Sequence, residues 1–370
     1  MTPAGGPWIL HVDVDAFLAS VELQRHPELA GLPVIVGGSG DPSEPRKVVT
    51  CASYEARTYG VHAGMPLRRA ARRCPDATFL PSDPAAYDAA SEQVMGLLRT
   101  LGHPVEVWGW DEAYVGGDLV ELREAVDLAG RIQDLVTAET GLTCSVGISD
   151  NKQRAKVATG FGKPAGIHAL TDENWMATMG DRAVDALWGV GPKTAKKLAA
   201  MGITTVAELA GTDAATLTSA FGPTTGLWIL LLAKGGGDDT VSAQPWVPRS
   251  RSHVVTFADD LTDRADMADA VTDLAHRTLA EVVEQHRVVT RVAVTVRTAS
   301  FFTRTRIRKL DLPTTDPGAV VTTALALLDL FDLDRPVRLL GVRLELAMPA
   351  PASAPMPAPR LAAGDVAGDR

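Results

Sequence analysis

The chain has 370 residues, of which 46% are hydrophobic and 22% charged, with a formal net charge of -9. This length predicts roughly two to four domains. The acidic balance excludes a protein that coats nucleic acid through its overall charge. Cys51, Cys74 and Cys144 are isolated, which argues against a zinc site or a disulfide framework and is typical of a reducing cytosol. The longest apolar stretch, GLWILLLA, is too short to span a bilayer, and no signal-peptide pattern is present.

The first predicted element is an apolar strand that runs into HVDVDAF and carries Asp13. Asp15 is placed to cap a helix in AFLASVEL, where Phe17, Leu18 and Val21 form an apolar stripe. The strand therefore delivers a carboxylate just before a helix begins.

The next informative segment, VVTCASYEARTYGVHAGMP, is predicted to run from a strand into a helical turn. It places Tyr54 and Arg57 at i and i+3 on one helical face. A phenol and a guanidinium in this arrangement can both hydrogen-bond one polyphosphate, the guanidinium as a bidentate fork.

The segment VEVWGWDEAYVGG carries the adjacent carboxylates Asp111 and Glu112. Together with Asp13 they form an oxygen-only ligand set, which favours Mg2+ and phosphoryl transfer over zinc hydrolysis. Neighbouring strand residues point to opposite faces, so Asp111 and Glu112 share a site only if the chain turns there. Gly109, in a predicted hairpin, permits such a turn. The alternative is a solvated surface pair.

The segment CSVGISDNKQRAKVATGFGKPAGI is a predicted strand followed by a helix that carries Lys152, Lys156 and Lys163. A basic stripe of this kind either binds phosphate or forms an ordinary solvated helix face, and the residues alone leave both interpretations open.

A glycine-rich turn in VDALWGVGPKTAKKLAAMGITTVAEL lies between two short predicted helices. Its backbone N–H groups, beside a helix N-terminus, suit one phosphate. The pattern resembles a helix-hairpin-helix, with Gly189, Gly191 and Lys193 as candidate DNA contacts. An ordinary helix pair joined by a glycine turn is the alternative.

Basic residues gather in one stretch of the C-terminal third, with no acidic residue among them: Arg287, Arg291, Arg297, Arg304, Arg306, Arg308 and Lys309. The alternation in TRVAVTVRT and FTRTRIRKL predicts strands with one apolar and one basic face. Such a sheet can lie along a nucleic-acid backbone and contact phosphates without reading bases. Arg297, Arg304, Arg306 and Arg308 are the candidate DNA contacts, and a merely exposed sheet face is the alternative.

Taken in order, these segments resemble the Y-family translesion DNA polymerases of the bacterial DNA polymerase IV class. The similarity extends over about residues 8–348 and rests on the succession DxDxFxASVE, YEARxxGVxxGMP, DEAY, SVGIxxNKxxAK and KP. The resemblance implies an α+β multidomain fold, a right-hand polymerase with palm, fingers, a helix-hairpin-helix thumb and a C-terminal little-finger sheet domain. The implied domains are palm 1–16 and 84–170, fingers 17–83, thumb 171–240, linker 241–250, little finger 251–348 and a disordered Pro/Ala tail 349–370.

The resemblance also implies roles for individual residues. Asp13, Asp111 and Glu112, with the backbone carbonyl of Val14, would hold two Mg2+ ions, for which Mn2+ would substitute. The residues implied to contact the incoming nucleotide are Phe17, Leu18, Cys51, Tyr54, Arg57 and Lys163. The implied reaction is in-line attack of a primer 3'-hydroxyl on the α-phosphate.

Two positions depart from the family pattern. Trp110 stands where the family usually has serine before the Asp-Glu pair. Leu18 stands where the family has an aromatic residue beneath the sugar of the incoming nucleotide, which excludes a 2'-hydroxyl. We therefore expect relaxed discrimination against ribonucleotides, the alternative being that Leu18 only packs in the core.

The expected protein is a low-fidelity polymerase and mutator that acts in lesion bypass, as a monomer in the bacterial cytoplasm near the nucleoid. Its expected partners are primer-template DNA, dNTP and rNTP, with no membrane. Family members commonly dock on the sliding clamp through a C-terminal Gln-x-x-Leu-x-aromatic-like peptide, which the tail lacks, so clamp binding through it is not expected. The alternatives are a nucleotide cyclase-like two-metal enzyme, which leaves the hairpin and basic strands unexplained, and a catalytically silent DNA-binding accessory protein.

Overall fold

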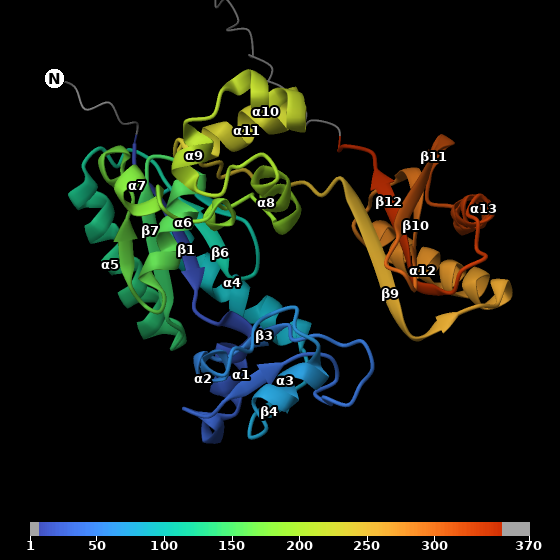
Figure 1. The fold of residues 1–370 in the computed structure, drawn as a ribbon. Helices are drawn as coiled ribbons and strands as arrows, with labels where there is room; N and C mark the ends of the chain where they lie inside the picture. Colours follow the sequence, from blue (N-terminus) through green and yellow to red (C-terminus); the bar gives the residue numbers. More distant parts are fainter. Residues whose placement is uncertain (1–6, 350–370) are drawn as a thin grey trace, which may run out of the picture. The chain divides into compact units, whose positions relative to one another are not determined.

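The computed structural model describes residues 7–349 and divides into two compact units, Met1–Trp246 and Val247–Arg370. Figure 1 shows sheets covered by helices in both units. This confirms the predicted α+β multidomain class. The division of the first unit into palm, fingers and thumb remains a prediction, and the N-terminal start and the tail beyond residue 349 lie outside the described residues.

The centre of the first unit is a five-stranded sheet in the order β5-β6-β1-β7-β8. All neighbours are antiparallel except β7 and β8, which are parallel. Its strands are β1 (Ile9–Val14), β5 (Val105–Val107), β6 (Glu112–Val115), β7 (Cys144–Ser149) and β8 (Ile167–Ala169). The helices of this region are α1 (Phe17–Arg25), α4 (Pro84–Thr100), α5 (Leu122–Thr140) and α6 (Lys152–Gly162).

Both faces of the central sheet are covered, which explains why every residue of β1 is buried. Leu10, Val12 and Val14 join the main core, to which α4 and α5 also contribute. Ile9 and the residues in step with it face α6 on the other side. Gly147 of β7 permits this close approach of α6, because a Cβ there would lie 2.0 Å from the Ala155 carbonyl oxygen.

A smaller sheet of three strands has the order β3-β2-β4 and its own core. Its elements are β2 (Val34–Val36), β3 (Cys51–Ala52), β4 (Thr78–Leu80), α2 (Tyr54–Thr58), α3 (Leu67–Arg73) and a 3-10 turn, η1 (Pro27–Leu29). Ser53 caps α2 by accepting a hydrogen bond from the Ala56 N–H. This cap fixes where the helix that carries Tyr54 begins.

The remainder of the first unit is helical around a third apolar core. Its elements are α7 (Asp172–Met179), the 3-10 turn η2 (Val184–Ala186), α8 (Pro192–Ala199), α9 (Val206–Ala210), α10 (Ala214–Phe221) and α11 (Pro223–Ala233). Capping boxes at Thr171 and Thr205 define the starts of α7 and α9.

The second unit is an antiparallel sheet in the order β11-β10-β12-β9, packed against two helices. Its elements are β9 (Ser250–Leu261), α12 (Arg264–Glu284), β10 (Val289–Thr298), β11 (Thr303–Thr314), α13 (Pro317–Leu328) and β12 (Val337–Leu346). One face of the sheet is closed by the helices, and β11 and β9 are its edges.

Candidate active site

Asp13 and Glu112 stand opposite each other in register on β1 and β6. Cross-strand partners project to the same face of a sheet. His11 and Tyr114, the next pair on that face, follow the same register. The hydroxyl of Thr159 on α6 lies 2.8 Å from the His11 ring, so this is the face that α6 covers. The pairing of two strands therefore brings together carboxylates that are far apart in the sequence.

The side chains of His11, Asp13 and Glu112 form a compact cluster, with one potential ligand atom of each within 4.8 Å of the others. Asp13 is only 8% exposed, and His11 is fully buried. Burial lowers the pKa of His11, which favours the neutral imidazole. An oxygen-rich cluster in a sheltered place is chemically suited to a divalent cation.

Each carboxylate of the cluster forms an ion pair with its own lysine. Lys163 contacts Asp13, and Lys156 Nζ lies 2.5 Å from Glu112 Oε1. Burial raises the pKa of Asp13, against the opposite pull of Lys163. Contacts with His11 and Lys156 hold the pKa of Glu112 at about 2. The two ammonium groups therefore supply the positive charge that a bound metal would otherwise bring to the carboxylates.

Asp111 directly precedes β6, where the chain bends, as the opposite-face argument requires. Its backbone oxygen accepts a hydrogen bond from the Val14 N–H at 2.9 Å. Burial and the neighbouring Glu112 raise the pKa of Asp111. Its side chain nevertheless does not belong to the cluster of His11, Asp13 and Glu112, so within residues 7–349 the predicted trio is assembled only in part.

Trp110 is anchored to α4. Its indole N–H donates to Asp88 at 2.7 Å, and its ring meets Tyr87 edge-on at 5.8 Å. Both partners belong to α4. Trp110 thus fixes the hairpin against α4.

Tyr54 and Arg57 lie on one face of α2, and the Arg57 guanidinium is 4.7 Å from the centre of the Tyr54 ring. The Tyr54 hydroxyl donates to Asp15 at 3.1 Å. Asp15 itself does not cap α1, contrary to our prediction. The N-cap is Ala16, which has a left-handed backbone and no side-chain cap bond, because the Asp15 carboxylate turns to other partners.

The other predicted nucleotide contacts line the same region. Phe17 and Leu18 open α1 and are buried in the main core, at 2% and 8% exposure. Cys51 is half-buried on β3 and packs against that core. Lys163 caps the C-terminal end of α6. Their contacts with a nucleotide remain predictions.

The three lysines of α6 do not form one basic stripe. Lys152 is buried, and its ammonium pairs with Glu106 at 2.8 Å and Asp238 at 2.9 Å. The prediction of a phosphate-binding or solvated stripe is therefore wrong for Lys152, because the segment after α11 folds over it. Lys156 and Lys163 do reach the carboxylates.

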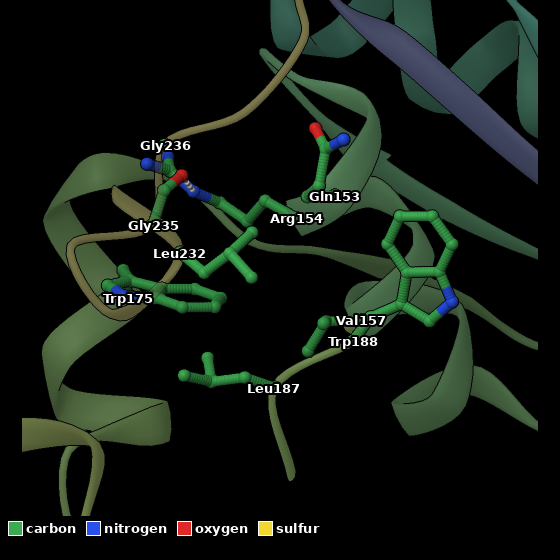
Figure 2. Close-up of a pocket in the computed structure, with 9 residues that line it drawn as sticks. All are labelled: Gln153, Arg154, Val157, Trp175, Leu187, Trp188, Leu232, Gly235 and Gly236. Atoms are coloured by element: carbon green, nitrogen blue, oxygen red, sulfur yellow. Dashed lines mark hydrogen bonds between the residues drawn. The ribbon is translucent and has the colours of Figure 1, made fainter. Parts of the chain in front are cut away.

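Figure 2 shows how that segment is fastened to α6. Arg154 Nε donates to the Gly235 carbonyl oxygen at 2.8 Å, and the guanidinium lies 5.5 Å from the centre of the Trp175 ring. Farther along, the Ser242 N–H donates to Glu106 at 2.7 Å. The start of the predicted linker is thus bound to the first unit.

The glycine turn of the predicted helix-hairpin-helix precedes α8. Gly189 has a φ of 100°, a left-handed value that favours glycine, and Gly191 is the N-cap of α8. Lys193 is exposed in the first turn of that helix. The element before the turn is the short 3-10 helix η2, so two short helices flank the turn as predicted.

The arginines of the C-terminal sheet lie on two faces, not one. Val292, Val294 and Val296 of β10 belong to the core beneath the helices, and their β11 partners are Arg308, Arg306 and Arg304. These arginines therefore emerge on the helix side at the sheet edge. The alternate positions of β10, which carry Arg291 and Arg297, face the other way. The prediction that β10 and β11 share one basic face is therefore wrong. The arginines of β11 pair with core valines of β10, so they lie on the opposite face from Arg291 and Arg297.

Sequence reasoning missed His11 as a neighbour of the carboxylates. Its spacing of two residues from Asp13 on a predicted strand was the available signal, because alternate strand residues share a face. Cys51, Cys74 and Cys144 are free in the structure. Among residues 7–349, no helix combines the length and apolar character needed to cross a membrane.

Comparisons with known proteins agree with this geometry. The impB/mucB/samB family model matches residues 12–160, its C-terminal domain model matches residues 248–354, and the SAM-like helix-hairpin-helix tandem model matches residues 181–228. "DNA polymerase IV 2" of Mycobacterium tuberculosis (strain ATCC 25618 / H37Rv) is 70% identical over 94% of this chain and 100% of its own length. "DNA polymerase IV" of Methanoculleus marisnigri is 38% identical over 92% of this chain and 95% of its own.

Among solved structures, a "Y-family DNA polymerase chimera Dbh-Dpo4(243-245)-Dbh" is similar, with a TM-score of 0.81 and 24% identity over 91% of this chain and 98% of that chain. The fold is thus that of the Y-family polymerases. The chain belongs to the impB/mucB/samB family, in the group that contains the DNA polymerase IV proteins.

Proposed function

We propose that the protein is a template-directed, low-fidelity DNA polymerase that extends a DNA primer by two-metal phosphoryl transfer. The observation that carries this proposal is the in-register pairing of Asp13 with Glu112 beside two lysines. Bound Mg2+, or Mn2+ in its place, would lower the pKa of the attacking hydroxyl and neutralise the leaving pyrophosphate.

The chain's own residues supply the rest of the chemistry in this proposal. Asp13, Asp111 and Glu112, with the Val14 carbonyl, would hold the cations. Tyr54, Arg57 and Lys163 bind and orient the triphosphate. A cleft of about 460 Å³ opens beside Asp13 and Lys163 and is lined mainly by α6 and by residues 179–188, so it adjoins the carboxylates but does not include Tyr54 or Arg57.

Primer extension with Mg2+ or Mn2+ tests the proposal. Glu112→Gln and Asp13→Asn should lower extension by at least about a hundredfold while primer-template binding persists, because the loss falls on transition-state charge. Asp118→Asn is the matched control, since Asp118 is exposed on the loop after β6. Turnover of nucleotides without a primer would favour the cyclase-like alternative. Binding of DNA without any nucleotide turnover would favour the accessory-protein alternative.

We also propose that Leu18 relaxes selection against ribonucleotides. A leucine side chain is shorter than an aromatic one and has more rotamer freedom, so it opposes a 2'-hydroxyl less. Leu18 opens α1, three residues after Asp15, the partner of the Tyr54 hydroxyl. Leu18 belongs to the core against which Tyr54 and Cys51 also pack, and this shared packing supports the proposal.

In the cell, we expect the enzyme to act as a monomer on chromosomal DNA in the bacterial cytoplasm, extending primers past template lesions. Extension on matched templates with and without one lesion tests the bypass role. Extension that stops at the lesion, while the lesion-free template is copied fully, would contradict it.

A further inference from the structure

Asp15 is a buried carboxylate, 2% exposed, whose oxygens are both fully engaged. Oδ1 accepts hydrogen bonds from the Tyr54 hydroxyl at 3.1 Å and the Ser145 hydroxyl at 2.8 Å. Oδ2 accepts from the Thr143 hydroxyl at 3.1 Å and the Ala165 N–H at 2.8 Å. A carboxylate has about four such acceptor sites, so Asp15 has none left for a metal, although it is only two residues from Asp13.

These partners come from three separate parts of the chain. Tyr54 begins α2, Ser145 belongs to β7, and Ala165 follows Lys163 by two residues. The carboxylate therefore joins the two segments that carry Tyr54 and Lys163, both candidate ligands of the triphosphate. β1 and β7 themselves are neighbours in the central sheet (Figure 1).

The backbone is strained on both sides of this junction. Ala16 has a φ of 44° and Ala165 a φ of 53°, values that alanine rarely adopts. Such conformations persist where the surroundings hold them, and they gather at functional sites. Here, the Ala165 N–H is one of the groups that Asp15 holds.

We propose that Asp15 is a positioning residue for the incoming nucleotide, which fixes Tyr54 and the loop that follows Lys163 in their binding positions. This inference rests on the proposed polymerase function. The hydrogen bond to Asp15 holds the Tyr54 ring, and the Arg57 guanidinium lies 4.7 Å from the centre of that ring. The other three bonds fix the carboxylate to β7 and to the loop after Lys163.

A double-mutant cycle in the full-length protein tests this role. The measured quantity is the dissociation constant of a matched dNTP on a dideoxy-terminated primer-template with Mg2+, where no chemistry occurs. Asp15→Ala should raise it roughly tenfold to a hundredfold, the range for the loss of a hydrogen bond to a charged group. Tyr54→Phe should then add less than about threefold in the Asp15→Ala background, because the two residues act together.

Variants of matched shape sharpen the test. In Asp15→Asn the oxygen faces the fixed Ala165 N–H and the amide donates to Tyr54 and Ser145, whose hydroxyls can accept, so the constant should stay within about threefold of wild type. Ser20→Ala is the control, since the Ser20 hydroxyl donates to the Asp15 backbone oxygen and not to its carboxylate. If Asp15→Ala does not fold, Asp15→Ser replaces it in the test. A serine side chain is too short to hold both partners, so we expect the same rise in the dissociation constant.

Unchanged affinity in Asp15→Ala, or effects of Asp15→Ala and Tyr54→Phe that multiply independently, would overturn the inference. A tenfold loss in folded Asp15→Asn would also overturn it, because charge and not position would then matter. If the wild-type protein itself bound no dNTP and extended no primer, the proposed function would fail instead, so the two failures are distinguishable.

Discussion

Asp13 and Glu112 face each other across two antiparallel strands, and a different lysine contacts each carboxylate. Lys163 belongs to the end of α6 and Lys156 to its middle. One helix thus supplies both compensating charges to the two strands. A cation that binds these carboxylates has to displace or share the ammonium groups.

Replacing Lys156 with methionine should tighten cation binding, because the ammonium and a metal compete for Glu112 Oε1. We expect the Mn2+ dissociation constant of the free protein, measured by electron paramagnetic resonance, to fall about threefold or more. Lys193→Met is the control, since Lys193 is exposed on α8. An unchanged constant in Lys156→Met would show that the ammonium does not oppose the metal.

The Leu18 hypothesis predicts that Leu18→Tyr or Leu18→Phe restores discrimination against ribonucleotides. Forcing the 2'-hydroxyl against a filled site reduces kcat/KM for the ribonucleotide by roughly tenfold to a hundredfold relative to the deoxynucleotide. The measurement is the ratio of kcat/KM for matched ribo- and deoxynucleotides on one template. Val21→Ile, which adds volume on the same helix, should leave the ratio unchanged. A wild-type ratio that already disfavours the ribonucleotide by orders of magnitude would refute the hypothesis.

The contributions of the two faces of the C-terminal sheet to DNA binding can be tested separately. Arg304 and Arg308 form no ion pair within the described part of the chain, whereas Arg291 pairs with Glu345 at 3.4 Å. We expect Arg304→Ala with Arg308→Ala to weaken binding at every sequence. The salt dependence should flatten by about 0.9 logarithmic units for each phosphate that the variant no longer neutralises. The same slope in wild type and variant would place the DNA elsewhere.

Arg306, between these two arginines on β11, has a structural role as well. Its guanidinium lies 5.3 Å from the centre of the Phe331 ring, and it is half-buried. Arg306→Ala should therefore lower the melting temperature of the protein as well as its DNA affinity, which Arg304→Ala should not do. Thermal unfolding of the two single variants compares them directly.

Glu208 gives a pH-dependent contribution to stability. It accepts hydrogen bonds from the backbone N–H groups of Thr204 and Thr205 at the start of α9, which lower its pKa from 4.5 to about 2. A carboxylate with a depressed folded-state pKa stabilises the fold fully above its unfolded value and loses this effect as pH falls through the folded value. Glu208→Gln should therefore lower the melting temperature at neutral pH, and the difference should shrink between pH 4.5 and about 2. A difference independent of pH would contradict this.

Deletion of residues 349–370 should leave binding to a sliding clamp unchanged, because the tail lacks the expected peptide motif. The measurement is the equilibrium binding of the full-length and truncated chains to a surface-bound clamp. A clamp complex that disappears on truncation would show that the tail contains an unrecognised docking sequence.

Features that depend on neighbours along the chain could be predicted from the sequence. The strand that carries Asp13, the hairpin before Glu112 and the shared helical face of Tyr54 and Arg57 follow from local periodicity and turn residues, and the structure has them. The order of motifs also defined the family.

Which of these groups meet depends on the tertiary structure. Cross-strand register put Arg304, Arg306 and Arg308 on the helix side of their sheet, and chain packing buried Lys152 in ion pairs. Asp15 left the helix cap because hydroxyls and an N–H from distant segments satisfy its carboxylate better than one local donor. Such outcomes depend on contacts between residues remote in sequence, which no periodicity encodes.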